Sequence, residues 1–355
     1  MSARCREQGV DCARGIAVMT MVWVHFVPVS ETGASFGDAA VRWSVNLLDG
    51  LPAALFLLLV GVAAGCAGTR PWPIVCRRAI GIALVGVSFW WFVWPNDVLV
   101  PIAVSILAVA SMQRLGAAAT WCAVLALLVM VPVATELWGD YVWYVDIRED
   151  GTHEANHSVG WHTVRYFLFD GAYPLLPWLC FPLVGLRLAA GMHDSRARRR
   201  WAVVAAMVCA VAVTLDRLCG DAWAGGLWAH LAVTWQPTSL PFVAAWGGGA
   251  VLVVLLSVTI GSGRCERLGC VGRASLTHYL LHLVVVYGAL RLIWPDEDWP
   301  RWVGLSAACG YGAFAWLGSR PWIERFGRGP LESLVHCWSL RATLPPRQDP
   351  PRNRP

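Results

Sequence analysis

Residues 47–61 read LLDGLPAALFLLLVG, and the chain stays apolar from there to residue 67. A helix needs about 20 apolar residues to cross the hydrocarbon core of a bilayer, so this segment predicts a membrane-spanning helix. Similar apolar blocks recur along the 355 residues, of which 57% are hydrophobic and only 14% are charged. Because a soluble protein carries about a quarter charged residues, we expect an integral membrane protein whose main partner is the lipid bilayer.

The apolar blocks predict an all-α fold of ten membrane-spanning helices in a single domain over residues 1–340. The predicted spans are residues 15–30, 47–67, 76–94, 97–113, 116–138, 171–192, 201–218, 238–262, 274–294 and 302–318. Residues 341–355 are rich in proline and arginine, which predicts a disordered cytoplasmic tail.

The distribution of charge predicts which side of the membrane each loop faces. All 28 basic residues are arginine, and ten spans place 22 of them on the side of the termini and 6 on the other side. Basic residues are enriched in cytoplasmic loops, so both termini are expected in the cytoplasm. We expect the protein in a bacterial plasma membrane. The lack of lysine excludes pyridoxal phosphate enzymes and P-loop NTPases, and the scattered arginines do not indicate a nucleic-acid partner.

Two polar residues mark the first predicted span. Arg14 and His25 are eleven residues apart, so they share one helix face and lie about 16 Å apart along the axis. Imidazole is the usual group for proton transfer near neutral pH, which makes His25 a candidate catalytic residue. The alternative is a buried histidine bonded to a neighbouring helix, with Arg14 as a cytoplasmic anchor.

The ninth predicted span carries a second pair of histidines. His278 and His282 are four residues apart on one helix face, and helix rise places His282 about 13 Å above Arg273, close to the depth of His25. No acidic residue lies between the two histidines, so we expect no metal site. Packing or a hydrogen-bonded tether is the alternative role for this pair.

Polar residues on the outer side form a third group of candidates. Asp49 opens the second predicted span, where it could orient a histidine, bind a substrate hydroxyl or simply start the helix. The stretch RYFLFDGAYPLLPWLCFPLVG, residues 165–185, holds Asp170, Tyr173 and Trp178 among three prolines. Irregular backbone at membrane depth must not face lipid, so these prolines predict a broken helix that lines a cavity.

Four stretches resemble motifs of one superfamily. The stretch DCARGIAVMTMVWVHF resembles the first helix of the type-three membrane acyltransferases and the related heparan-α-glucosaminide N-acetyltransferases, with Arg14 and His25 in matching positions. The stretch DGLPAALFLLLVG resembles the second helix of the superfamily. Two further stretches, YPLLPWLCFPLVG and GRASLTHYLLH, resemble a proline–tryptophan motif and a late tyrosine–leucine–histidine motif. They occur in the family's order over residues 4–325.

The resemblance implies an enzyme that moves an acyl group, usually acetyl from cytoplasmic acetyl-CoA, to a hydroxyl or amine of a sugar, glycan or small metabolite. It implies that His25 is the base or the acyl acceptor. The candidate catalytic residues are His25, Asp49 and His282, the candidate donor-binding residues are Arg14, Arg77 and Arg78, and the candidate substrate-binding residues are Asp170, Tyr173, Trp178 and His278.

Two departures from the family pattern bear on the mechanism. The glucosaminide branch places its catalytic histidine in the loop after the first helix, whereas residues 30–49 contain no histidine here. The type-three family has an arginine pair spaced R-x-x-R, whereas Arg77 and Arg78 are adjacent. The sequence also leaves open a transporter or flippase, since transporters place charged residues at mid-membrane, although we find no inverted repeat.

Overall fold

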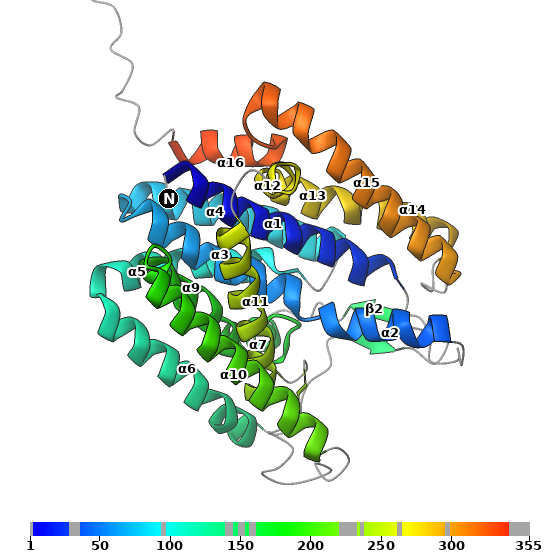
Figure 1. Ribbon diagram of the computed structural model, residues 1–355. Helices are drawn as coiled ribbons and strands as arrows, with labels where there is room; N and C mark the ends of the chain where they lie inside the picture. Colours follow the sequence, from blue (N-terminus) through cyan, green and yellow to red (C-terminus); the bar gives the residue numbers. More distant parts are fainter. Residues whose placement is uncertain are drawn as a thin grey trace, which may run out of the picture.

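The helices of the protein pack into one bundle, with a short C-terminal helix across one end (Figure 1). The computed structural model describes residues 3–27, 36–93, 97–138, 145–147, 153–155, 161–219, 233–234, 238–260, 265–294 and 299–340. The helices are α1 (Ala3–Phe26), α2 (Phe36–Leu48), α3 (Leu51–Ala67), α4 (Trp72–Phe92), α5 (Leu99–Leu115), α6 (Ala117–Trp138), α7 (Trp161–Arg165), α8 (Leu175–Trp178), α9 (Cys180–Gly191), α10 (Ser195–Cys219), α11 (Leu240–Ile260), α12 (Glu266–Arg273), α13 (Ser275–Leu281), α14 (Gly288–Ile293), α15 (Arg301–Phe326) and α16 (Pro330–Leu340).

Helix length and composition make this an integral membrane protein. Among the described residues, five helical stretches are long and apolar enough to cross a membrane: Ser44–Ala67, Trp72–Phe92, Ser195–Leu218, Leu240–Ile260 and Ser275–Ile293. Shorter apolar helices cover Leu99–Leu115, Ala117–Val131 and Leu175–Gly191. A helix coincides with each of the ten predicted spans, while the number that cross the bilayer and the side of the termini stay predictions.

Several elements differ from the expectation. Helices α2, α7, α12 and α16 lie outside the predicted spans, and a two-stranded antiparallel hairpin pairs β1 (Val145–Ile147) with β2 (His153–Ala155). The ninth predicted span contains a π-helical turn, η4 (His282–Tyr287), between α13 and α14. The predicted tail, residues 341–355, lies outside the described residues.

The sixth predicted span is broken, as its prolines indicate. A π-helical turn, η1 (Tyr166–Asp170), is followed by extended backbone at Gly171 and Pro174, and Leu176 is non-helical inside α8. A regular helix, α9, follows from Cys180. Pro101, by contrast, lies in the first turn of α5, where a helix does not need its missing N–H group.

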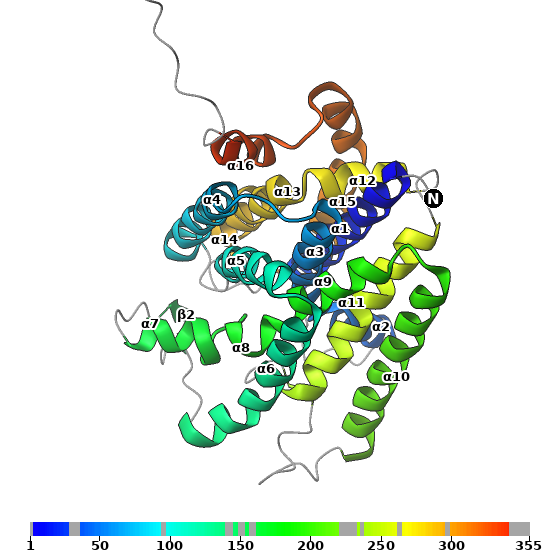
Figure 2. The same ribbon diagram turned by 90° about the vertical axis from the view of Figure 1, so that its left-hand side faces the viewer.

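The first helix crosses α12 at very close range, and this crossing positions α13, which directly follows α12. A Cβ atom on Gly272 would overlap the carbonyl oxygen of Asp11, and a Cβ atom on Gly15 would overlap the carbonyl oxygen of Leu268. Small residues permit such close backbone contact between membrane helices. Figure 2 shows the result, with α1 beside α12, α13 and α15 in the same layer of the bundle.

Candidate functional site

Two histidines from opposite ends of the chain meet inside the bundle. The Nδ1 atom of His25, near the end of α1, lies 2.9 Å from Nε2 of His282, and the two rings stack with centroids 5.2 Å apart. His282 is fully buried. The end of α1 is held in place by Trp299, whose indole N–H donates to the carbonyl oxygen of Phe26 at 3.1 Å. The two depths calculated from helix rise therefore describe one place.

The hydrogen bonds of His282 determine the direction of proton donation between the two rings. Nδ1 of His282 lies 2.9 Å from the carbonyl oxygen of His278. A carbonyl can only accept, so Nδ1 carries the proton and Nε2 of the neutral ring carries the lone pair. His25 then donates its Nδ1–H to His282, and the basic nitrogen of the neutral His25 ring is Nε2. The two hydrogen bonds thus fix the tautomer and the orientation of the His25 ring.

The backbone changes type at His282. The α-helical turns of α13 end at Leu281, and the π-helical turn η4 starts at His282 itself. A single π-helical turn inserted in an α-helix is uncommon and is frequently found at functional sites. At the start of this turn His282 contacts His25 on α1, while His278, four residues earlier, contacts α15.

His278 has a different environment from His282. Its Nδ1 lies 3.0 Å from the Tyr311 hydroxyl and its Nε2 lies 2.8 Å from the Ser319 hydroxyl, both on α15. Both ring nitrogens are thus hydrogen-bonded to protein groups, and the side chain is buried. The structure places His278, a candidate substrate-binding residue, as a tether between α13 and α15.

A cavity of about 700 Å³ lies below the histidine pair, between α1, α3, α4, α5, the α12–α13 junction and α16. Its polar lining consists of Asp11, Arg14, Arg70, Arg78, Gln113, His193, Arg273, Ser275, Tyr279, Arg328, Glu332, His336 and Ser339. Tyr279 forms the inner end, and its ring centroid lies 6.0 Å from that of His282. The cavity therefore leads from a strongly basic mouth toward the histidine pair.

The candidate donor-binding arginines take different positions. Arg14 and Arg78 line the cavity, and Arg14 forms an ion pair with Asp11 in the preceding turn. Arg77 does not line this cavity, and its carbonyl oxygen accepts a hydrogen bond of 3.1 Å from Trp338 on α16. Successive side chains on a helix point about 100° apart, so of the two adjacent arginines only Arg78 lines the cavity.

A buried aspartate that was not among the candidates, Asp97, bonds to Tyr279 at the inner end of the cavity. Asp97 is 3% exposed and accepts hydrogen bonds from the Tyr279 hydroxyl at 2.9 Å and from the Leu99 N–H at 3.0 Å. In the sequence, Asp97 is only the first residue of the fourth predicted span. An aspartate two residues before an apolar helix is the signal that could have identified it, because such a residue accepts from the first N–H groups of the helix.

The outer candidates lie away from the described cavity. Asp49 is exposed where α2 meets α3, and Tyr173 is half-buried with its ring edge-on to Trp178 at 5.1 Å. Trp178 is 1% exposed and donates to the Thr238 hydroxyl at 3.0 Å, so it belongs to the core. The backbone of Asp170 ends η1, and its side chain lies outside the described residues.

Comparison with known families agrees with this architecture. The family model described as heparan-alpha-glucosaminide N-acetyltransferase, catalytic, matches residues 6–218, more than half of the chain. A second model, described as protein of unknown function (DUF418), matches residues 187–342. A search of the curated proteins finds no match. The histidine pair joins the two matched segments, since α1 lies in the first and η4 in the second. The chain belongs to the heparan-α-glucosaminide N-acetyltransferase family of membrane acetyltransferases.

Proposed function

We propose that the protein transfers an acyl group, in particular acetyl, from acyl-CoA to a hydroxyl or amine of a sugar, glycan or small metabolite. The observation that carries this proposal is the hydrogen bond between His25 and His282 next to an arginine-lined cavity. The family uses acetyl-CoA as its donor. The basic mouth suits the phosphates of that donor, since guanidinium groups bind phosphate oxygens in pairs.

In this mechanism His25 acts as the general base. Its Nε2 takes the proton of the acceptor hydroxyl or amine as that group attacks the thioester carbonyl carbon. The carbon–sulfur bond breaks, and the CoA thiolate takes the proton back from the imidazolium. His282 is the positioning residue, because its Nε2 accepts the Nδ1–H of His25 and keeps the basic nitrogen on the opposite edge of the ring.

The donor is proposed to enter from the cytoplasm. The cavity lining includes His193, which directly precedes the arginine-rich stretch DSRARRR of residues 194–200. This stretch begins α10, and the enrichment of basic residues on the cytoplasmic side predicts that it faces the cytoplasm. Arg14, about 16 Å below His25 by helix rise, and Arg78 then contact the donor's phosphates.

The acceptor is proposed to arrive from the opposite side. Trp23, two residues before His25, donates a hydrogen bond of 3.1 Å to Ser44 on α2, and α2 leads directly to Asp49. The exposed Asp49 is therefore proposed to bind an acceptor hydroxyl, with Tyr173 and Asp170 on the same side. Trp178 supports the shape of this region from the core.

Thiol release tests the proposal directly. Purified protein in detergent, given acetyl-CoA and a panel of sugars and amines, should release free CoA thiol only when an acceptor is present. His25→Ala should reduce the rate by about 10²–10⁴-fold, the usual cost of losing a general base, while CoA still binds. Release of thiol without any acceptor, with acetyl retained on the protein, would instead identify His25 as an acyl acceptor. Movement of a substrate across the membrane without thiol release would identify a transporter.

A further inference from the structure

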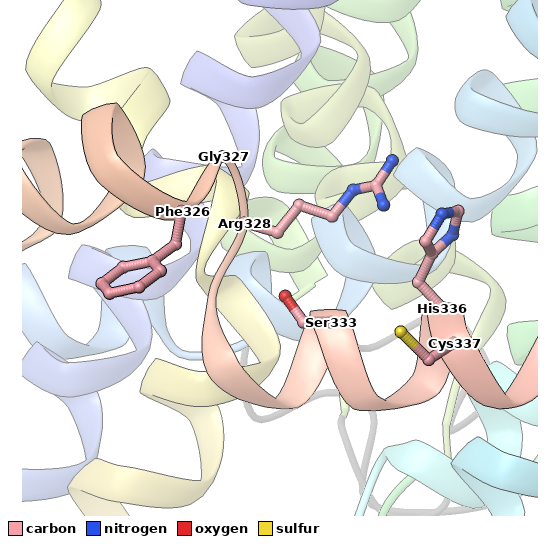
Figure 3. Close-up of a pocket in the computed structure, with 6 residues that line it drawn as sticks. All are labelled: Phe326, Gly327, Arg328, Ser333, His336 and Cys337. Atoms are coloured by element: carbon pink, nitrogen blue, oxygen red, sulfur yellow. The ribbon is translucent and has the colours of Figure 1, made fainter.

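Two cavities adjoin at the C-terminal helix. A smaller cavity of about 300 Å³ is lined by Phe326, Gly327, Arg328, Ser333, His336 and Cys337 (Figure 3). Gly327, Arg328 and His336 also line the large cavity below the histidine pair. In Figure 3 the side chains of Arg328 and His336 extend to the same side of α16, whereas Phe326 points away. The large cavity therefore continues to the surface past these two residues.

The mouth of the large cavity concentrates positive charge. Arg328, Arg78 and Arg70 each lower the pKa of His336, after the larger effect of its burial, so the three guanidinium groups lie near this ring. Among the described residues, the guanidinium groups of Arg70, Arg78 and Arg328 form no hydrogen bond or ion pair, whereas Arg14 is paired with Asp11. Like charges at close range repel, and a multiply charged anion between them removes the repulsion.

The one carboxylate that α16 contributes to the lining does not neutralise this cluster. Glu332 accepts from the Leu276 N–H at 2.5 Å and from the Thr277 N–H and hydroxyl at 3.2 and 2.7 Å, at the start of α13. At its other end α16 is fixed by the hydrogen bond from Trp338 to the carbonyl oxygen of Arg77. These bonds hold α16, and with it His336, at the rim, while the carbonyl oxygen of Arg328 accepts a hydrogen bond of 3.0 Å from Trp322.

We propose that Arg328 and His336, with Arg70, bind the 3′-phosphate of the CoA donor and make the enzyme selective for CoA over thioesters that lack this phosphate. The inference rests on the proposed function. The thioester must reach the inner end, at Tyr279 and the histidine pair, so the opposite end of the donor lies at the rim. That end of CoA carries the adenosine 3′-phosphate, and the unpaired arginines lie there.

Binding measurements on the full-length protein in detergent test the proposal. The probes are CoA, dephospho-CoA, adenosine 3′,5′-bisphosphate, inorganic phosphate and vesicles of phosphatidylglycerol. Wild-type protein should bind CoA about 10- to 100-fold more tightly than dephospho-CoA, the range expected for charge-assisted hydrogen bonds to one phosphate. Arg328→Gln should remove most of this difference, raise the KM for acetyl-CoA and leave kcat unchanged. His336→Gln should act in the same direction more weakly.

Arg325→Gln is the matched control. Arg325 lies one turn back on α15, over the ring of Phe326 at 5.5 Å, and lines neither cavity. This variant should bind CoA and dephospho-CoA as the wild type does.

Three outcomes would overturn the inference, and only one of them affects the proposed function. Equal binding of CoA and dephospho-CoA by wild-type protein that still releases thiol would reject the phosphate site alone. Competition by inorganic phosphate or phosphatidylglycerol vesicles as strong as that by adenosine 3′,5′-bisphosphate would also reject it alone. Failure to bind any CoA compound, together with no thiol release, would reject the proposed function itself.

Discussion

The Tyr279 hydroxyl donates a 2.9 Å hydrogen bond to the carboxylate of Asp97, which joins α13 to the start of α5. The other carboxylate oxygen accepts from the first N–H group of α5, that of Leu99, at 3.0 Å. Tyr279 lies at the inner end of the large cavity, one helical turn before His282. This contact therefore fixes the boundary between the cavity and the histidine pair.

Asp97→Asn should destabilise the protein by about 1–3 kcal/mol, the cost of leaving a buried hydrogen-bonding group unsatisfied. The amide has one accepting oxygen in place of two, so it cannot accept from both Tyr279 and Leu99. Thermal unfolding in detergent measures this loss, and the KM for acetyl-CoA should rise as Tyr279 shifts. Tyr279→Phe keeps the bond to Leu99 but also removes the acceptor of the Val98 N–H, 3.4 Å from the Tyr279 hydroxyl, so it should destabilise the protein as well. Equal stability of Asp97→Asn and the wild type would contradict the assigned role.

The two ways of replacing His282 should differ. His282→Gln retains an acceptor oxygen near the position of Nε2, so it can still accept the Nδ1–H of His25, whereas His282→Leu cannot. We expect His282→Gln to keep substantially more acyl-transfer activity than His282→Leu, with the loss in kcat, because the role is positioning. The initial rate of thiol release at saturating acetyl-CoA measures the difference. Equal activity of the two variants would show that the bond to His25 is unimportant.

Donor binding should strengthen as the pH falls from about 8 toward 6.5. Burial, then Arg328, Arg78 and Arg70, hold the pKa of His336 below its usual value of 6.5 in the free protein. A phosphate bound beside His336 favours the charged ring and raises this pKa, so binding takes up a proton and tightens at lower pH. The other titratable or charged groups of the cavity are Asp11, Arg14, His193, Arg273 and Glu332.

His336→Gln separates the contribution of His336 from that of these groups. Titration calorimetry of CoA in buffers of different ionisation enthalpy measures the protons taken up. The wild type should take up more protons than His336→Gln, whose affinity should vary less with pH over the same range. Identical proton uptake by the two proteins would rule out His336 as the linked group.

Glu332→Gln should loosen α16 from the bundle. A glutamine presents an amide group to three donors that now bond to a carboxylate, so part of the contact with Leu276 and Thr277 is lost. Limited proteolysis should then cut near residues 327–340 faster than in the wild type, and the KM for acetyl-CoA should rise. Glu324→Gln is the matched control, because its ion pair with Arg320 is exposed and contributes little. Equal proteolysis of both variants would contradict the docking role.

Reporter fusions test the predicted topology. The split of 22 against 6 arginines places residue 150 outside and residue 200 in the cytoplasm. An alkaline phosphatase fused after Asp150 should be active, and one fused after Arg200 should be inactive, with the reverse for a fluorescent protein that folds only in the cytoplasm. The same side for both sites, or an outer C-terminus, would reject the topology.

Hydrophobic length predicted the helices well, because an apolar block near 20 residues has few other stable forms. The same measure missed α16, which has only 11 residues and is too short to span a membrane. Helix rise also predicted that His25 and His282 lie at similar depth. Depth alone could not separate His282 from His278, because both lie on one α-helical face, yet His282 contacts His25 on α1 and His278 contacts Ser319 on α15.

Rotation about the helix axis, which sequence spacing alone does not provide, explains the remaining differences. Arg77 and Arg78 are equivalent in composition, yet only Arg78 lines the cavity. The position of Asp97 before α5 indicates a role at the start of that helix, but its bond to Tyr279, 182 residues away, cannot be read from the sequence. Such contacts between distant segments depend on the whole packing of the bundle.

The close crossing of α1 and α12 also sets the angle at which α1 runs toward His282. Gly15 and Gly272 lie at the crossing point, and His25 lies ten residues further along α1, a distance of about 15 Å. A rigid helix that tilts at the crossing point displaces its far end by the tilt angle times this distance. A methyl group on Gly272 would therefore change the distance between the imidazole rings of His25 and His282. The hydrogen bond between His25 and His282 thus depends on the lack of a side chain at Gly15 and Gly272, two residues that contact neither ring.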